Sequence, residues 1–229
     1  MKKALKIIVE VLLALLAVLL VYLIYQSVME PVNFNKEKEA REAVAIQRLK
    51  DLRTLEVAFK GVNGHYTASV DSLKDFFENG KMKVIMQIGS QDDSIAVANT
   101  ARIKKQNRKI TNEQLMEMYN AGEKNLVFSV STDLAVKDTL FHGRENFHLD
   151  SLAFIPFSGD SVLMESVVKK VSGVDVPLFE ARMPYKSLLK GVDHQLIVNL
   201  NADRENQNKY EGLQVGSVSA PNNNAGNWE

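Results

Sequence analysis

The sequence predicts an α+β protein with a single N-terminal transmembrane helix, a long amphipathic helix and a mostly antiparallel sheet in one extracytoplasmic domain. Three observations lead to this fold class. An apolar run extends from Ile7 to Tyr25, and a helical pattern of apolar residues follows it. The second half of the chain holds several short segments that are typical of strands.

The apolar run from Ile7 to Tyr25 contains one charge, Glu10, and has the length that spans a bilayer, which takes about 20 residues. A cleaved signal peptide has a shorter apolar core and a small-x-small cleavage site, and 26–31 offers no such site. An interfacial helix would show a polar face, and 11–25 has none. We therefore expect an uncleaved transmembrane anchor over 1–30.

The flanks of this run predict its orientation in the membrane. Lys2, Lys3 and Lys6 precede it, and positive charge stays on the cytoplasmic side. Tyr22 and Tyr25 lie at its other end, where aromatic rings favour the headgroup layer. We expect a single-pass protein of a bacterial inner membrane, with a cytoplasmic N-terminus and a periplasmic C-terminal domain.

Lys6 and Glu10 are the first candidate site, a membrane-helix interaction. They are four residues apart, so their side chains can meet on one helix face. In one interpretation they form a salt bridge at the cytoplasmic interface. In the other, Glu10 is an intramembrane carboxylate that marks a helix-packing contact or a proton site.

A second helix is predicted over 31–62. Pro31 is expected to interrupt the first helix, and Asn33 or Asn35 can cap the next one. One face carries a stripe spaced by three and four residues, which either packs on the protein's own sheet or forms a coiled-coil seam. The stripe residues proposed for interaction are Leu49, Leu52, Leu55 and Phe59. The helix should end near Gly61–Gly64.

The region 63–200 is expected to form one α+β periplasmic domain. Short helices are predicted at 73–78 and 112–121, the latter with a capping box from Thr111 to Gln114, and at 184–189. The stretch 90–109 is polar and turn-rich. Pro177 marks the strand that contains it as an edge strand or irregular. The predicted strands are 81–89, 126–130, 133–141, 151–157, 162–171, 174–183 and 195–199.

The segment 201–229 is expected to be a polar C-terminal tail. Its asparagine-rich end favours disorder, while the only tryptophan of the chain, Trp228, can instead anchor the tail onto its own domain or onto a partner.

Composition and motifs exclude several kinds of chemistry. The chain has no cysteine, which removes thiol nucleophiles and cysteine metal sites, and its 28 basic and 28 acidic residues argue against nucleic acid as a partner. The four histidines lack zinc-site spacing, and 199–205 resembles only the start of a calcium loop. Asp92 and Asp93 are read as a solvated loop, and the cations of 102–109 as a solvated face or a contact for anionic headgroups. We expect no cofactor, no metal and no catalytic residue, and no enzyme.

A cationic start, an apolar helix with an early glutamate, an amphipathic continuation and the element Gly64-His65-Tyr66 occur in this order. This layout resembles type IV pilins and the pseudopilins of type II secretion. The resemblance implies that Glu10 pairs with a neighbouring subunit's terminus and that 7–62 forms an assembly spine. The prepilin peptidase site is absent, because the first glycine of the chain is Gly61.

The expected function is therefore a structural component of an envelope complex, of a secretion or pilus-like kind. Its partners would be the lipid bilayer and other membrane or periplasmic proteins, including itself. One alternative is a subunit of a proton-driven stator or biopolymer-transport motor, with Glu10 as the carboxylate. Another is a membrane-tethered periplasmic binding domain, and a third is a membrane-tethered hydrolase.

Overall fold

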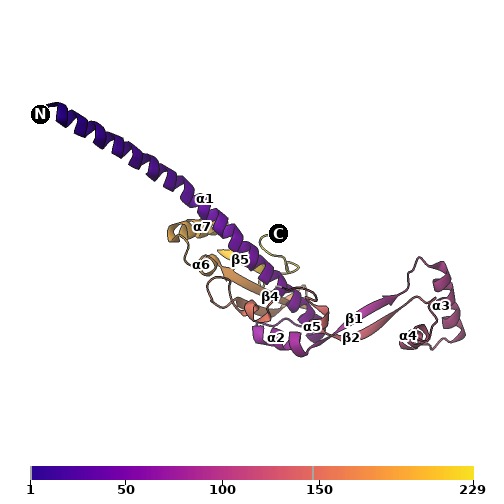
Figure 1. The fold of residues 1–229 in the computed structure, drawn as a ribbon. Coiled ribbons are helices and arrows are strands. Elements are labelled where there is room, and N and C mark those ends of the chain that lie inside the picture. Colours follow the sequence, from indigo (N-terminus) through magenta and orange to yellow (C-terminus); the bar gives the residue numbers. More distant parts are fainter. Residues whose placement is uncertain (1, 146) are drawn as a thin grey trace. The chain divides into compact units, whose positions relative to one another are not determined.

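A computed structural model describes the backbone of residues 2–145 and 147–229, and the side chains of 6–145 and 147–229. The fold is α+β, with a long N-terminal helix and antiparallel sheets, as the sequence predicts (Figure 1). The chain folds into two compact units. The first unit comprises the described residues of Met1–Thr54, Tyr66–Val70 and His148–Glu229. The second unit comprises those of Leu55–His65 and Asp71–Phe147.

Helix α1 (Lys2–Asn63) runs unbroken for 62 residues, so the predicted interruption at Pro31 is wrong. Proline removes one backbone N–H donor and crowds the carbonyl four residues before it. Both flanks of Pro31 are strongly helical, and the helix continues through this local defect. The predicted end is confirmed at Gly64, whose φ of 79° suits glycine and whose N–H donates to the Lys60 carbonyl at 2.8 Å.

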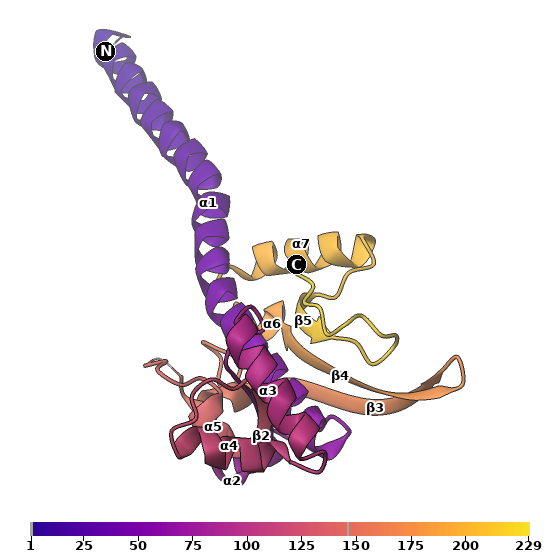
Figure 2. The ribbon, with the colours of Figure 1, turned by 90° about the vertical axis from the view of Figure 1, so that its right-hand side faces the viewer.

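The first unit contains one antiparallel sheet in the order β3-β4-β5, formed by β3 (Leu163–Val171), β4 (Val174–Pro184) and β5 (Gly212–Gly216) (Figure 2). Strand β3 pairs with Val174–Arg182 of β4, while β5 pairs only with Glu180–Pro184. Pro177 lies in the half of β4 that β5 leaves unpaired, so the missing N–H breaks no ladder on that side. Strand β4 is therefore the central strand of the sheet, but the half that contains Pro177 has a neighbour on one side only, as an edge strand does.

The core of the first unit forms where α1 meets the sheet and two short elements, η1 (Leu149–Ala153) and α6 (Tyr185–Leu188). The tilted rings of Tyr66 and Phe179 pack together with their centroids 4.8 Å apart. The side chains that are almost fully excluded from solvent include Ala45, Leu49, Leu52, Phe179, Ala181, Met183, Leu188, Leu189 and Val215.

The second unit is built on a two-stranded antiparallel ribbon of β1 (Lys81–Ile88) and β2 (Phe128–Ala135). Figure 1 shows α3 (Ser94–Gln106) and α4 (Asn112–Asn120) at one end of this ribbon. There they enclose a small apolar core of Ile103, Leu115, Leu126, Phe128 and Val130. Helices α2 (Val70–Asn79) and α5 (Val136–Thr139) adjoin the chain positions where the ribbon begins and ends.

The prediction of a polar, turn-rich stretch over 90–109 is wrong, because α3 occupies most of it. Asp93 caps this helix by accepting from the N–H groups of Ile95 and Ala96. Ala96, Thr100 and Ile103 are buried at helical spacing. The five cations of this region obscured that narrow apolar face in the sequence.

The prediction of a strand at 195–199 is also wrong, because α7 (His194–Asn206) covers it. Asp193 caps α7 by accepting from the Leu196 N–H at 2.8 Å. Only Ile197 is buried, and the short apolar run Leu196-Ile197-Val198, with its two β-branched residues, imitated a strand in the sequence. Helix α7 also crosses the expected boundary between domain and tail at 200.

Two further differences concern 3₁₀ and tail structure. The strand predicted for 151–157 is a 3₁₀ turn followed by one isolated bridge between Phe154 and Ser161. The tail supplies strand β5 and an isolated bridge from Gly226 to Val215. By contrast, the capping box of Thr111 and Gln114 is confirmed at the start of α4.

Candidate functional site

The apolar run of α1 makes no core with the described chain. Its large side chains from Ile7 to Tyr25 are each between 47% and 69% exposed. The helix is long and apolar enough to cross a membrane, and none of its most apolar window is buried. An apolar surface of this size in water would be unfavourable, at about 25 cal/mol for each Å². A core helix of a soluble protein would instead be mostly covered, so this segment needs another environment.

Lys6 and Glu10 lie side by side on this helix, with Lys6 Nζ and Glu10 Oε1 3.8 Å apart. Both side chains are open to the surroundings, at 77% and 61% exposure. The geometry matches the paired interpretation of the two residues. Neither contacts any other charged group among the described residues, so the pair is local to one turn of α1.

The predicted interaction stripe lies inside the protein. Leu49, Leu52 and Leu55 are fully buried. Phe59 is half-buried and packs edge-on against Phe76, with ring centroids 5.3 Å apart. These four residues therefore fill the chain's own interior, as the packed-face interpretation expects, and leave no seam for a second helix at this position.

Two arginines of α1 bind backbone carbonyls elsewhere in the first unit. The guanidinium of Arg41 donates to the carbonyls of Leu188 and Lys190 at 3.2 and 3.0 Å. Arg48 donates to the carbonyls of Ser151 and Phe154 at 3.0 and 2.8 Å. Desolvation lowers the pKa of Arg48, but the group still titrates far above neutral pH. Each arginine thus holds two backbone carbonyls that lie more than 100 residues away along the chain.

A buried phenol forms the third link between α1 and the first unit. The Tyr185 hydroxyl donates a short hydrogen bond to Glu42, whose other oxygen accepts from Lys38 at 3.2 Å. The guanidinium of Arg204 lies 5.4 Å from the Tyr185 ring centroid. Burial, and then the bond to Glu42, raise the pKa of Tyr185 well above its ordinary value. The phenol therefore remains a neutral donor at all working pH values and acts as a structural link.

A cavity of about 730 Å³ lies beside the end of the apolar run, between α1 and the turn that leads into α7. Glu30, Glu37 and Asp193 line it together with Arg41 and the rings of Tyr22 and Tyr25. Arg41 is already bonded to Glu37 at 2.7 Å. The cavity is open to its surroundings.

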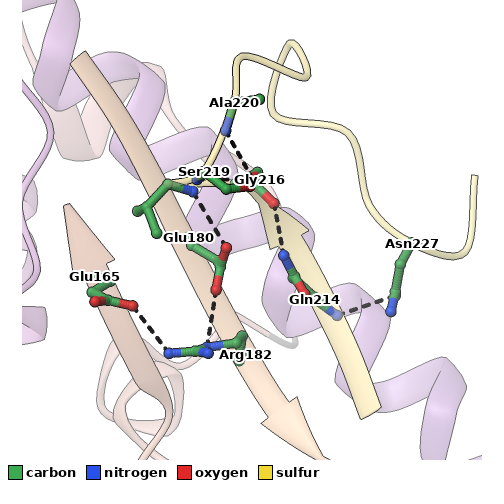
Figure 3. A network of polar contacts seen from close by, with 10 residues as sticks. Glu165, Glu180, Arg182, Gln214, Gly216, Ser219, Ala220 and Asn227 are labelled. Atoms are coloured by element: carbon green, nitrogen blue, oxygen red, sulfur yellow. Dashed lines mark hydrogen bonds and ion pairs between the residues drawn. The ribbon is translucent and has the colours of Figure 1, made fainter. Parts of the chain in front are cut away.

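The sheet of the first unit carries a polar network (Figure 3). Arg182 pairs with both Glu165 and Glu180, at 3.0 Å in each case. Glu180 is nearly buried and also accepts from the Val218 N–H at 3.3 Å. Its neighbours in Figure 3, Gln214 and Asn227, bond to each other through backbone and side chain at 3.1 Å. These contacts link β3 with β4 and β4 with the chain that follows β5, so the network stabilises the sheet.

The tail is docked on α1 rather than disordered. Arg53 donates to Glu229 Oε1 at 2.8 Å and to the Asn224 carbonyl at 3.2 Å. The amide of Asn224 in turn donates to the Tyr66 hydroxyl at 2.9 Å. The indole nitrogen of Trp228 is buried, in line with the anchoring alternative.

The remaining candidates take structural positions. Asn199, Asn201, Asp203 and Glu205 lie on helix α7 and cannot form a calcium loop, which needs a tight turn. Asp93 caps α3, and the cations of 102–109 are exposed. Among the described residues, no three His, Asp or Glu side chains gather closely enough to hold a metal ion.

Sequence reasoning missed Arg41 and Arg48, whose side chains define how α1 is held. They are seven residues apart and lie beside the buried stripe, which is a readable signal. It missed Tyr185 for a different reason, since nothing local connects residue 185 with residue 42.

Comparisons of the chain with protein-family models, with curated proteins and with solved structures find no match.

Proposed function

We propose that this chain is a single-pass membrane protein whose folded part is held outside the cytoplasm, where it acts as a structural component of an envelope assembly of the secretion or pilus-like kind. One observation carries the proposal. Within a single helix, the large side chains of 7–25 are all exposed, while Leu49, Leu52 and Leu55 are fully buried. Lipid covers the first region, and the protein's own core covers the second.

The orientation follows from the two ends of the apolar run. Lys6 lies at its start, and cations are retained on the cytoplasmic side. Tyr22 and Tyr25 lie at its other end, at the level of the headgroups. The arginine and tyrosine links from α1 to the first unit then hold the folded part close to the outer surface of the membrane.

The proposed role is binding rather than catalysis. The best-formed polar clusters of the described chain, around Tyr185 and around Arg182, use their donors and acceptors on other parts of the same chain. Such groups stabilise a fold and present no free nucleophile or base to a substrate.

The proposal is tested by affinity purification of the tagged full-length protein in mild detergent, followed by chemical crosslinking and mass spectrometry. We expect alkali-resistant membrane association and crosslinks to a defined set of membrane or periplasmic proteins, including copies of the chain. A monomeric protein recovered without partners would contradict the assembly role. Recovery in the soluble fraction would contradict the membrane anchor.

A proton-driven motor subunit is the second candidate, and the observation that favours it is the carboxylate of Glu10 within the exposed apolar run of α1. The variant Glu10→Gln separates the two functions. A motor would keep its complex and lose its activity, while an assembly subunit that uses Glu10 for packing would lose the complex. The variant Lys6→Gln is the matched control, because it removes the same ion pair and keeps the carboxylate.

A further inference from the structure

Five cations gather at the C-terminal end of α3 and in the turn that leads to α4, in the part of the second unit that lies at one end of the ribbon (Figure 1). All five residues are exposed. No acidic residue occurs between Asp93 and Glu113, so this is a local excess of positive charge in a chain whose total charge is balanced. We call it the cationic patch, and its members are Arg102, Lys104, Lys105, Arg108 and Lys109.

The chain's own carboxylates do not neutralise the cationic patch. Among the described side chains, Arg102 bonds to Asn99 Oδ1 at 2.8 Å, and no member of the patch forms an ion pair. The two acidic residues that flank the patch in the sequence lie at helix starts, since Asp93 caps α3 and Glu113 lies in the first turn of α4. The C-terminal end of a helix favours cations, but this accounts only for the two lysines in the last turn of α3.

Apolar side chains share the open surface of α3 with the cationic patch. One side of the helix is buried in the small core at the end of the ribbon. On the remaining surface, Ile95 is 71% exposed and Val97 is 37% exposed. Ile95 lies seven residues before Arg102, so the two residues are on the same side of the helix, two turns apart. The exposed part of α3 therefore combines cations with apolar groups and carries no carboxylate.

We propose that the cationic patch, together with Ile95, docks onto a lipid surface that carries anionic headgroups. Clustered cations on a surface helix are attracted to such headgroups, and an exposed apolar side chain can enter the boundary with the acyl chains. A nucleic acid offers phosphates but no apolar layer for Ile95. This contact goes beyond the proposed function, because it is separate from the membrane anchor and lies in the second unit.

The test measures how the full-length protein, held in nanodiscs of phosphatidylcholine, sediments with added vesicles. One set of vesicles is pure phosphatidylcholine, and the other also contains phosphatidylglycerol. We expect binding to the anionic vesicles and none to the neutral ones. Raising the salt concentration should weaken this binding, because salt screens exposed charges.

The double variants Lys104→Gln/Lys105→Gln and Arg108→Gln/Lys109→Gln each remove two charges of the cationic patch. Each should weaken binding to the anionic vesicles by about tenfold or more. Ile95→Ser should weaken it several-fold and leave the salt dependence unchanged, because it removes the apolar contact and keeps every charge.

Lys169→Gln/Lys170→Gln is the matched control, because it removes two adjacent exposed lysines from β3 in the first unit. It should leave binding unchanged. Far-UV circular dichroism of each variant distinguishes lost binding from lost folding. Equal binding to both kinds of vesicle, binding to neither, or an equal loss in the control would overturn the proposal. Alkaline extraction tests the membrane anchor separately, so failure of the anchor and failure of the patch give different results.

Discussion

The two ends of helix α1 are both rich in large aliphatic residues, but these side chains are exposed at the first end and buried at the second. Leu16 is 49% exposed, while Leu49 is fully buried. The first end is apolar on all sides, and the second is apolar on one face with charges on the others. A helix without a polar face cannot be solvated by water on any side, whereas a one-sided helix needs only one covering surface. The arrangement of apolar residues, more than their number, therefore indicates which environment each end requires.

The strongest test of this difference between the two ends of α1 is to replace one leucine at each end by alanine. Leu49→Ala should lower the free energy of unfolding by about 2–5 kcal/mol, because it leaves a cavity in a packed core. Leu16→Ala should leave that energy unchanged, because its side chain contacts no core. Urea unfolding in mild detergent, followed by Trp228 fluorescence, measures both. Equal losses for the two variants would show that the first end also packs on the folded part.

A charge at the centre of the apolar run probes the environment of the first end directly. Leu16→Lys should disfavour membrane insertion by about 2.5–3.5 kcal/mol, the cost of a cation at the middle of a membrane helix. Val44→Lys is the control, at a site on the same helix that is 41% exposed and lies beyond the run. The measurement is the fraction of each variant in alkali-extracted membranes. If both variants remain equally membrane-bound, the run from 7 to 25 is not the anchor.

Tyr185→Phe tests how firmly the second end is held. Removing the hydroxyl leaves Oε1 of Glu42 without its donor and should cost about 1–3 kcal/mol of unfolding free energy in the first unit. Tyr119→Phe, in the small core at the end of the ribbon, should leave that energy unchanged. Urea unfolding monitored at Trp228 reports both variants. A neutral result for Tyr185→Phe would show that the hydrogen bond to Glu42 does not contribute to holding α1.

The smallest expected effect is the release of the tail by acid. The hydrogen bond from Arg53, and then one from the backbone of Gly226, hold the pKa of Glu229 below its ordinary value of 4.5. A lowered pKa means that the charged form favours the docked tail. This contribution is present above about pH 4.5 and is lost as the pH falls through the lowered pKa.

Trp228 fluorescence checks this prediction, because it is the only tryptophan of the chain. Its emission should move to longer wavelength below about pH 4.5 in the unmodified protein. Glu229→Gln should remove this acid step and show a partly shifted emission already at neutral pH. An identical acid step in the variant would assign the change to another carboxylate.

Local signals in the sequence predicted most of the helices and hairpins. The capping box at Thr111, the end of α1 at Gly64 and the strands β1, β3 and β4 are each encoded within a few residues. The two helices that the sequence analysis missed share a cause. In α3 and α7 a capping aspartate begins a helix with a narrow buried face, and the exposed polar residues conceal the helical period.

The contacts that hold α1 could not be predicted in the same way. The pairs Glu42–Tyr185 and Arg48–Phe154 are 143 and 106 residues apart, so no local pattern connects them. The stripe of Leu49, Leu52 and Leu55 was visible, but whether it meets the chain's own core or a partner depends on strands that lie far along the chain.

The bond between Arg53 and Glu229 joins residues 176 positions apart, which has a consequence for biosynthesis. At ribosomal speeds of about 5–20 residues per second, α1 is made roughly 10–35 s before the segment that completes its packing. Until η1, β4 and α6 have followed, Leu49 and Leu52 are exposed to whatever surrounds the nascent chain. A holding chaperone that binds the emerging chain would protect them, and cells lacking it should accumulate aggregates nucleated by the unfinished helix.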